Sequence, residues 1–182
     1  MPRIKSNLVS VYVVRDAPSA AATPLELLML QRPNDYPLPG DWQAVHGHIE
    51  PNEPAWRAAL REQHEETGLP VLHWYRLTEI ESFFNPANDT IYLVPAFVAV
   101  VPPDAPTTLS DEHQACVWRT LDQAITMFSW QTQRRTIDTL REATHDWPTL
   151  GAALLPMDTA ALHRASLDPP PASTEPPPAP KD

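Results

Sequence analysis

Three closely spaced glutamates, Glu62, Glu65 and Glu66, are the side chains of this sequence best suited to chemistry. In a helix, residues three and four positions apart share one face, so the three carboxylates would lie on one turn. Like charges placed this way repel one another unless a cation lies among them. Hard oxygen ligands without cysteine suit Mg²⁺ or Mn²⁺. The pattern therefore indicates a divalent metal site.

The same segment also allows a purely structural interpretation. Arg57 and Arg61 stand one helical turn from Glu53, Glu62 or Glu65, so they can form ion pairs along the helix surface. Trp56, Ala59 and Leu60 recur at helical spacing on the other side and would pack against a sheet. An exposed helix with many ion pairs is a common arrangement and needs no metal.

The spacing of the fixed residues favours the metal site. A glycine is followed by five residues and a glutamate, then by seven residues and Arg-Glu. Two further residues lead to Glu-Glu, and one more to Gly and an apolar residue. These positions are Gly47, Glu53, Arg61, Glu62, Glu65, Glu66, Gly68 and Leu69. This pattern resembles the signature of the Nudix hydrolases. One position departs from it, because Gln63 stands where the family usually has an apolar residue. The resemblance implies a hydrolase of phosphoric anhydrides that uses Mg²⁺ or Mn²⁺.

The resemblance also implies a role for each residue of the motif. Glu62, Glu65 and Glu66 would be metal ligands, joined by a backbone carbonyl of His46 or Gly47. Glu53 and Arg61 would hold the loop–helix–loop in shape and orient these ligands. Metals in this family are bound by oxygen, which disfavours the rings of His46 and His48 as ligands.

Family members often take a further carboxylate from a later loop, as a metal ligand or general base. Asp111 and Glu112 are the candidates, and we favour Glu112 because the Glu-His pair followed by Trp118 resembles triphosphate-cleaving members. A solvated acidic loop is the alternative. The general base stays open between Glu65 and Glu112.

The expected substrate is a nucleotide or pterin triphosphate. The segments around Trp42, around Glu112 and from Trp130 to Arg134 are similar to bacterial hydrolases of dihydroneopterin triphosphate and of (d)NTPs, which implies a monophosphate and pyrophosphate as products. Trp42 and Trp130 are large enough to stack on a base, although core packing is the commoner fate of tryptophan. Arg32 and Arg134 are candidates for phosphate contacts. The alternatives are dinucleoside polyphosphates, ADP-ribose or nucleotide sugars as substrates, or a nucleotide-sensing domain without catalysis.

The elements that position these residues follow from hydrophobic periodicity and turn signals. A helix is expected from about Glu53 to Thr67, with Asn52 as N-cap and Gly68 just beyond the end. The expected strands are Leu8–Val14, Leu25–Leu30, Trp42–Val45, Leu72–Phe84, Thr90–Val101 and Ala115–Arg119, and the remaining helices are Leu121–Met127 and Trp130–Thr144. The order predicts an α/β fold, and the resemblance implies the Nudix α/β/α sandwich, with a mixed sheet between helices.

Composition sets the wider limits. The 182 residues carry a net charge of −10, which argues against a nucleic-acid polymer as partner. The lone cysteine, and the lack of a signal pattern or a long apolar window, predict a cytoplasmic protein without a membrane span. We expect a catalytic domain over residues 1–165 and a disordered proline-rich tail over residues 166–182. The family resemblance also suggests a homodimer.

Overall fold

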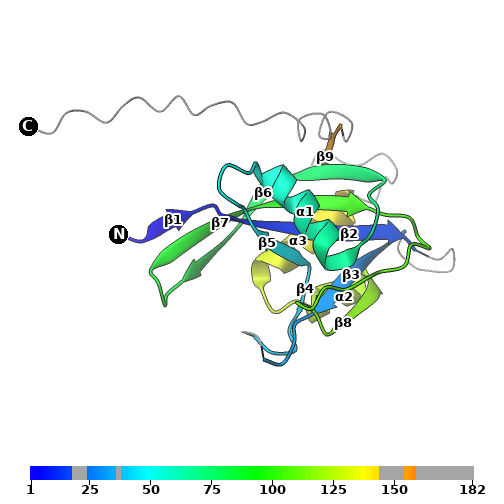
Figure 1. The fold of residues 1–182 in the computed structure, drawn as a ribbon, viewed down its shortest axis with the longest axis horizontal. Coiled ribbons are helices and arrows are strands. Elements are labelled where there is room, and N and C mark those ends of the chain that lie inside the picture. Colours follow the sequence, from blue (N-terminus) through cyan, green and yellow to red (C-terminus); the bar gives the residue numbers. More distant parts are fainter. Residues whose placement is uncertain (18–23, 36–37, 144–153, 159–182) are drawn as a thin grey trace, which may run out of the picture.

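The computed structural model describes residues 1–17, 24–35, 38–143 and 154–158 of the chain. This part folds into one mixed sheet with helices on both faces (Figure 1). The strands are β1 (Arg3–Lys5), β2 (Leu8–Asp16), β3 (Leu25–Gln31), β4 (Trp42–Gln43), β5 (Val45–His48), β6 (His73–Asn85), β7 (Thr90–Val100), β8 (Ala115–Thr120) and β9 (Leu154–Met157). The helices are α1 (Ala55–Thr67), α2 (Leu121–Met127) and α3 (Gln131–Ala143).

Strand β2 lies in the interior of the sheet, and its pairing fixes where the glutamate motif begins. The main path through the sheet is β4-β3-β2-β7-β6-β9. Strand β2 pairs in parallel with β7, while its first half pairs antiparallel with β5, so that Val9 lies opposite Gly47. The motif therefore starts on a strand held against the centre of the sheet.

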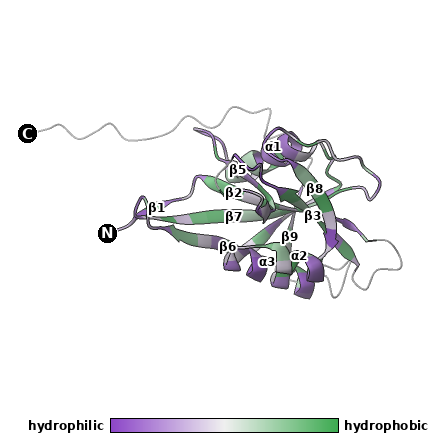
Figure 2. Ribbon diagram, turned by 90° about the horizontal axis from the view of Figure 1, so that it is seen from below, coloured by the Kyte–Doolittle hydropathy of each residue, from purple (hydrophilic) through white to green (hydrophobic). Residues whose placement is uncertain are grey.

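The two faces of β2 contribute to two separate hydrophobic cores. Val9, Val11 and Val13 pack in the cluster that includes residues of α1. Tyr12 and Val14 point the other way, into the cluster that includes residues of α2 and α3. Figure 2 shows the same layering, with α1 on one side of the sheet and α2 and α3 on the other. This arrangement confirms the predicted α/β/α sandwich.

The start of the first helix differs from the prediction. Helix α1 begins at Ala55 with Pro54 at the N-cap and no side-chain cap, so both Glu53 as first residue and Asn52 as cap were wrong. Asn52 adopts a left-handed conformation, with φ 66°. The Glu53 carboxylate instead closes the preceding loop by accepting a hydrogen bond from the backbone N–H of Glu50 at 3.1 Å.

Most of the other predicted elements are present, with small changes. The stretch Trp42–Val45 is divided between β4, which pairs with β3, and β5, which pairs with β2. Pro95 lies opposite Ile80 beside a register shift in β6. Proline has no N–H to donate to the ladder, and this irregularity accommodates it although β7 lies between β2 and β6.

Two strands were not predicted. Strand β1 has only three residues, and β9 contains a proline, so neither carries a strong strand pattern. Thr144, at the predicted end of α3, and the proline-rich segment 166–182 lie outside the described residues. No helix within the described ranges is long and apolar enough to cross a membrane.

Candidate active site

Helix α1 is anchored at its end by two residues of the motif. Gly68 has φ 65°, the left-handed conformation that glycine adopts readily, and its N–H donates to the carbonyl of His64 at 2.8 Å. Gln63, at the position where the family has an apolar residue, is only 1% exposed. Its amide donates to Thr67 Oγ1 at 2.9 Å and to the carbonyl of Leu69 at 3.1 Å. Although Gln63 is polar where the family has an apolar residue, its buried amide nitrogen therefore has hydrogen-bond partners.

Arg61 connects the loop before α1 to the acidic face of the helix. Its Nε and Nη2 donate to the two carboxylate oxygens of Glu53 at 3.1 and 3.0 Å, a bidentate pair. Nη1 donates to Glu62 Oε1 at 2.9 Å and to Glu65 Oε2 at 3.0 Å, and Nη2 also reaches the carbonyl of His48 at 2.9 Å. The hydrogen bond with Glu53 raises the pKa of Arg61 above its usual value. One guanidinium thus holds three carboxylates in place.

Glu62 packs directly against strand β5. The backbone N–H of His48 donates to Glu62 Oε1 at 3.1 Å. A Cβ atom added to Gly47 would lie 2.0 Å from Glu62 Cδ, so the glycine provides the space that this side chain fills. Burial raises the pKa of Glu62, and the hydrogen bond from Arg61 opposes the shift.

Glu66 is the most deeply buried carboxylate of the motif. Its side chain is 3% exposed, and its Oε2 lies 2.6 Å from His113 Nε2. Its Oε1 has no hydrogen-bond partner in the described part of the chain. Burial raises the pKa of Glu66 to about 7, with the hydrogen bond to His113 acting in the opposite direction. A cation beside Glu66 would favour its charged form.

These residues fit a divalent cation by their chemistry. Among the described residues, no three His, Cys, Asp or Glu side chains already converge as a metal cage. Arg61 instead neutralises Glu62 and Glu65, and the Glu65 side chain is 55% exposed. The buried, unpartnered Oε1 of Glu66 lacks a positive partner. Carboxylate oxygens of this kind are the ligands that Mg²⁺ prefers.

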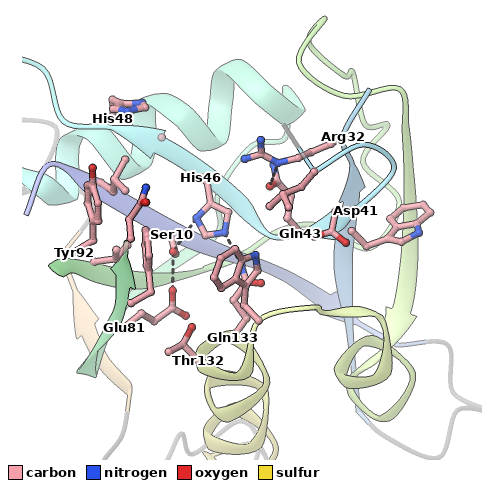
Figure 3. Close-up of a pocket in the computed structure, with 18 of the residues that line it drawn as sticks. Ser10, Arg32, Asp41, Gln43, His46, His48, Glu81, Tyr92, Thr132 and Gln133 are labelled. Carbon is pink, nitrogen blue, oxygen red and sulfur yellow. Dashed lines mark hydrogen bonds between the residues drawn. The ribbon is translucent and has the colours of Figure 1, made fainter. Parts of the chain in front are cut away.

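A cavity of about 630 Å³ lies beside β5, bordered by strands β2, β6 and β7 and by the start of α3 (Figure 3). Five of the predicted site residues line it: Arg32, Trp42, Gly47, Glu112 and Trp130. Arg134 does not belong to this lining, and its Nε donates to the carbonyl of Phe128 at 2.7 Å. Arg134 therefore binds a backbone carbonyl within the fold and does not line the cavity.

The acidic loop supplies Glu112 to the cavity. Both Asp111 and Glu112 are exposed, but only Glu112 lines the cavity. The negative charge of Glu112 also raises the pKa of Glu66, although burial is the largest cause of that shift. The location agrees with the preference for Glu112, whose role as ligand or base stays a prediction.

Aromatic side chains form one wall of the cavity. Trp130 is 45% exposed, and its ring lies 5.8 Å from that of Phe83. Phe83 stacks on Tyr92 with ring centroids 4.9 Å apart and planes 11° apart. Trp42 lines the cavity and also packs on the core, while Arg32 Nε donates to Gln43 Oε1 at 2.6 Å. The wall provides flat surfaces for a planar ring.

The floor of the cavity is a polar network that the sequence did not reveal. Ser10 donates to Glu81 Oε2 at 2.9 Å, and Tyr12 donates to the other oxygen of the same carboxylate. His46 bridges Ser10 Oγ at 3.0 Å and Gln133 at 2.6 Å, so both ring nitrogens are engaged within the fold. A metal role for the His46 ring is therefore not supported, whereas His48 presents its backbone to Arg61 and Glu62.

His113, Glu81 and Gln133 are the site residues that sequence reasoning missed. His113 follows the predicted Glu112, and this adjacency was the available signal. Glu81 is a charged residue inside an aromatic strand, which is unusual for a core position. Gln133 had no signal, because an isolated glutamine on an amphipathic helix looks like a surface residue.

Comparisons with known proteins agree with this geometry. The family model described as NUDIX domain matches residues 7–140. An asymmetrical bis(5′-nucleosyl)-tetraphosphatase from Sus scrofa is 34% identical over 119 residues, covering 63% of this chain and 77% of the relative. A solved C. elegans Ap4A hydrolase in a binary complex has a TM-score of 0.60 and 26% identity, covering 74% of this chain and 93% of that chain.

A Nudix hydrolase from M. smegmatis has a TM-score of 0.63 at 19% identity, covering 81% of this chain and 91% of that chain, which supports the fold alone. The family model covers well over half of the chain. Of its signature, Gly47 lines the cavity and Glu62 packs against Gly47. The chain belongs to the NUDIX domain family and is a Nudix hydrolase acting on phosphoric anhydrides.

Proposed function

We propose that this protein hydrolyses dinucleoside polyphosphates, with bis(5′-nucleosyl) tetraphosphates such as Ap4A as substrates. The reaction adds water to one phosphoric anhydride and releases a nucleoside triphosphate and a nucleoside monophosphate. One observation carries the proposal. The relative from Sus scrofa and the solved structure from C. elegans, found by sequence and by structure separately, are both named as enzymes of this class.

This substrate class replaces the triphosphates expected from the sequence. The comparisons favour the alternative of dinucleoside polyphosphates over (d)NTPs or dihydroneopterin triphosphate. The cavity of about 630 Å³ is within the range of ligand pockets and has an aromatic wall for a base. Its lining also includes Gly47, against which Glu62 packs. A base on the aromatic wall would thus lie in the same cavity as phosphates near the acidic helix.

Glu62, Glu65 and Glu66 would hold Mg²⁺ in this reaction. When bound, Mg²⁺ lowers the pKa of water and neutralises charge on phosphate oxygens. Glu66 contributes a buried oxygen that has no other partner in the described chain. His113, at 2.6 Å, orients Glu66 from the opposite side. Arg61 links Glu53 and the backbone carbonyl of His48 to helix α1 by hydrogen bonds.

The proton of the attacking water needs a base at the cavity. Glu112 is exposed, lines the cavity and approaches Glu66 closely enough to affect its pKa. Glu65 is the other candidate, with a side chain that is 55% exposed. Either carboxylate can accept a proton while the remaining ligands stay in place.

A substrate panel with product analysis tests the proposal. Purified protein with Mg²⁺ is incubated separately with Ap4A, dATP, dihydroneopterin triphosphate and ADP-ribose, and products are separated by ion exchange. We expect Ap4A to be cleaved fastest, to ATP and AMP, and chelation with EDTA to stop the reaction. Cleavage of Ap4A to ADP alone, or faster release of pyrophosphate from dATP, would contradict the proposal.

A further inference from the structure

Gln133 presents a buried oxygen that nothing in the described chain satisfies. The residue lies in the first turn of α3, is 4% exposed and lines the cavity. Its Nε2 lies 2.6 Å from His46 Nε2, whereas its Oε1 accepts no hydrogen bond from the described residues. Buried polar atoms are nearly always paired, and an exception needs an explanation. In a ligand cavity, such an acceptor marks a place for a donor on the ligand.

The hydrogen bonds behind Gln133 determine which atom of its amide faces His46. Glu81 Oε2 accepts the hydroxyl proton of Ser10 at 2.9 Å, so Ser10 Oγ can only accept from His46 Nδ1 at 3.0 Å. His46 then has a lone pair on Nε2, which requires an N–H from Gln133. The amide nitrogen therefore faces His46 (Figure 3), and the buried oxygen is left without a hydrogen-bond partner among the described residues.

Two further hydroxyl groups donate hydrogen bonds to the Glu81 carboxylate of this network. Thr136 Oγ1 donates to Glu81 Oε1 at 2.7 Å, and the Tyr12 hydroxyl donates to the same oxygen. Burial raises the pKa of Tyr12, as does the charge of Glu81, so this hydroxyl keeps its proton. Because Ser10 donates its only hydroxyl proton to Glu81, the direction of the bonds from Ser10 through His46 to Gln133 is set. The free acceptor at Gln133 is thus a preorganised feature of the cavity.

Trp130 places a stacking surface next to this acceptor. It stands directly before α3, and both Trp130 and Gln133 line the cavity. The Trp130 side chain is 45% exposed, and the centroid of its ring lies 5.8 Å from that of Phe83. A planar base stacked on Trp130 would direct one edge toward Gln133 Oε1.

We propose that Gln133 determines base specificity by accepting a hydrogen bond from an exocyclic amino group, with adenine as the base. This role rests on the proposed function and names the base in that same cavity. Adenine presents its 6-amino group as a donor. Hypoxanthine and guanine have an oxygen at this position, which would bring two acceptors together.

Selectivity between matched substrates tests the role of Gln133. For the wild-type protein, kcat/KM for Ap4A should exceed that for diinosine tetraphosphate by about tenfold or more, as expected for one buried hydrogen bond to a base. Gln133→Met keeps the length of the side chain but removes the amide, and should bring the ratio near one. Gln131→Met, on the same helix but exposed and outside the cavity lining, should keep the wild-type ratio. Trp130→Ala should reduce both rates together.

Binding of single nucleotides separates base recognition from hydrolysis. Calorimetry with AMP and IMP should give tighter binding of AMP to wild-type protein, with the difference lost in Gln133→Met. If Ap4A and diinosine tetraphosphate are cleaved equally, Gln133 has no role in specificity although the proposed function stands. If neither is cleaved, the proposed function is wrong, and base recognition stands only if AMP still binds more tightly than IMP. Should Gln133→Met fail to fold, the wild-type ratios alone decide.

Discussion

A Cβ atom on Gly47 would lie 1.9 Å from Cγ of Glu62, a distance that no pair of real carbon atoms tolerates without a bond. The first glycine of the motif is therefore needed for space, because Gly47 is not among the residues with positive φ. The side chain that fills the space is also bonded to the N–H of His48 and to Arg61. Strand β5 and the acidic helix thus pack closely at this contact.

Gly47→Ala should displace Glu62 and lower kcat by about a hundredfold, as expected when a metal ligand is moved by an ångström or more. Overpacking of this kind also costs about 1–3 kcal/mol of unfolding free energy. Activity and urea unfolding are measured together. Gly68→Ala is the matched control, because it strains a left-handed residue without approaching Glu62. Equal loss of activity in the two variants would mean that stability alone explains the effect.

The buried Glu66 makes the stability of the metal-free protein depend on pH. Its folded pKa of about 7 lies above the ordinary glutamate value of 4.5, so the native state binds more protons than the unfolded chain between these values. This contribution to stability is complete below the unfolded pKa and is lost as pH rises through about 7. In EDTA, the free energy of unfolding should fall by about 3 kcal/mol at most from pH 5 to pH 8.

Glu66→Gln should flatten this pH dependence, measured by urea unfolding across the same range. Glu79→Gln, at an exposed position of β6, is the control and should keep the wild-type slope. Mg²⁺ should stabilise the wild-type protein more as pH rises, because the ligand must be deprotonated to bind metal. A slope that persists in Glu66→Gln would assign the effect to another group.

The acidic loop offers a paired comparison of neighbouring carboxylates. Glu112→Gln should lower kcat more than about tenfold, because Glu112 lines the cavity and is the proposed ligand or base. Asp111→Asn, which removes the same charge one residue away, should stay within about twofold of wild type. Rates are measured at saturating Ap4A and Mg²⁺. Similar effects of the two substitutions would return the loop to a general electrostatic role.

Much of the fold could be predicted because its strands and helices have clear periodic patterns. The β-branched apolar run of β2 and the apolar face of α3, with Ile137 and Leu140 buried, are examples of such patterns. The fixed spacing from Gly47 to Leu69 was equally informative about the acidic helix. The start of α1 was not predictable from capping rules, because the carboxylate of Glu53 is used by Arg61 and by the loop.

The cavity floor depends on contacts between segments far apart in the sequence. Ser10, Glu81 and Gln133 come from β2, β6 and α3, and they meet only because of how these elements pair and pack. Strand register is not readable from one sequence, and β6 has a register shift between Arg76 and Ile80. The glutamates proposed as metal ligands could be recognised because they share one helix, whereas the residues of the cavity floor could not.

The central claim is that the acidic face of α1 holds the metal ion that drives hydrolysis, and Glu65→Gln tests it most directly. This substitution is nearly isosteric and affects a side chain that is 55% exposed, so the thermal unfolding midpoint should change little. Glu142→Gln, at an exposed position of α3, is the control for loss of one negative charge. With saturating Mg²⁺ and Ap4A, we predict that kcat of Glu65→Gln falls on the order of a thousandfold while Glu142→Gln matches wild type. A Glu65→Gln protein that retains kcat within tenfold of wild type would contradict the account.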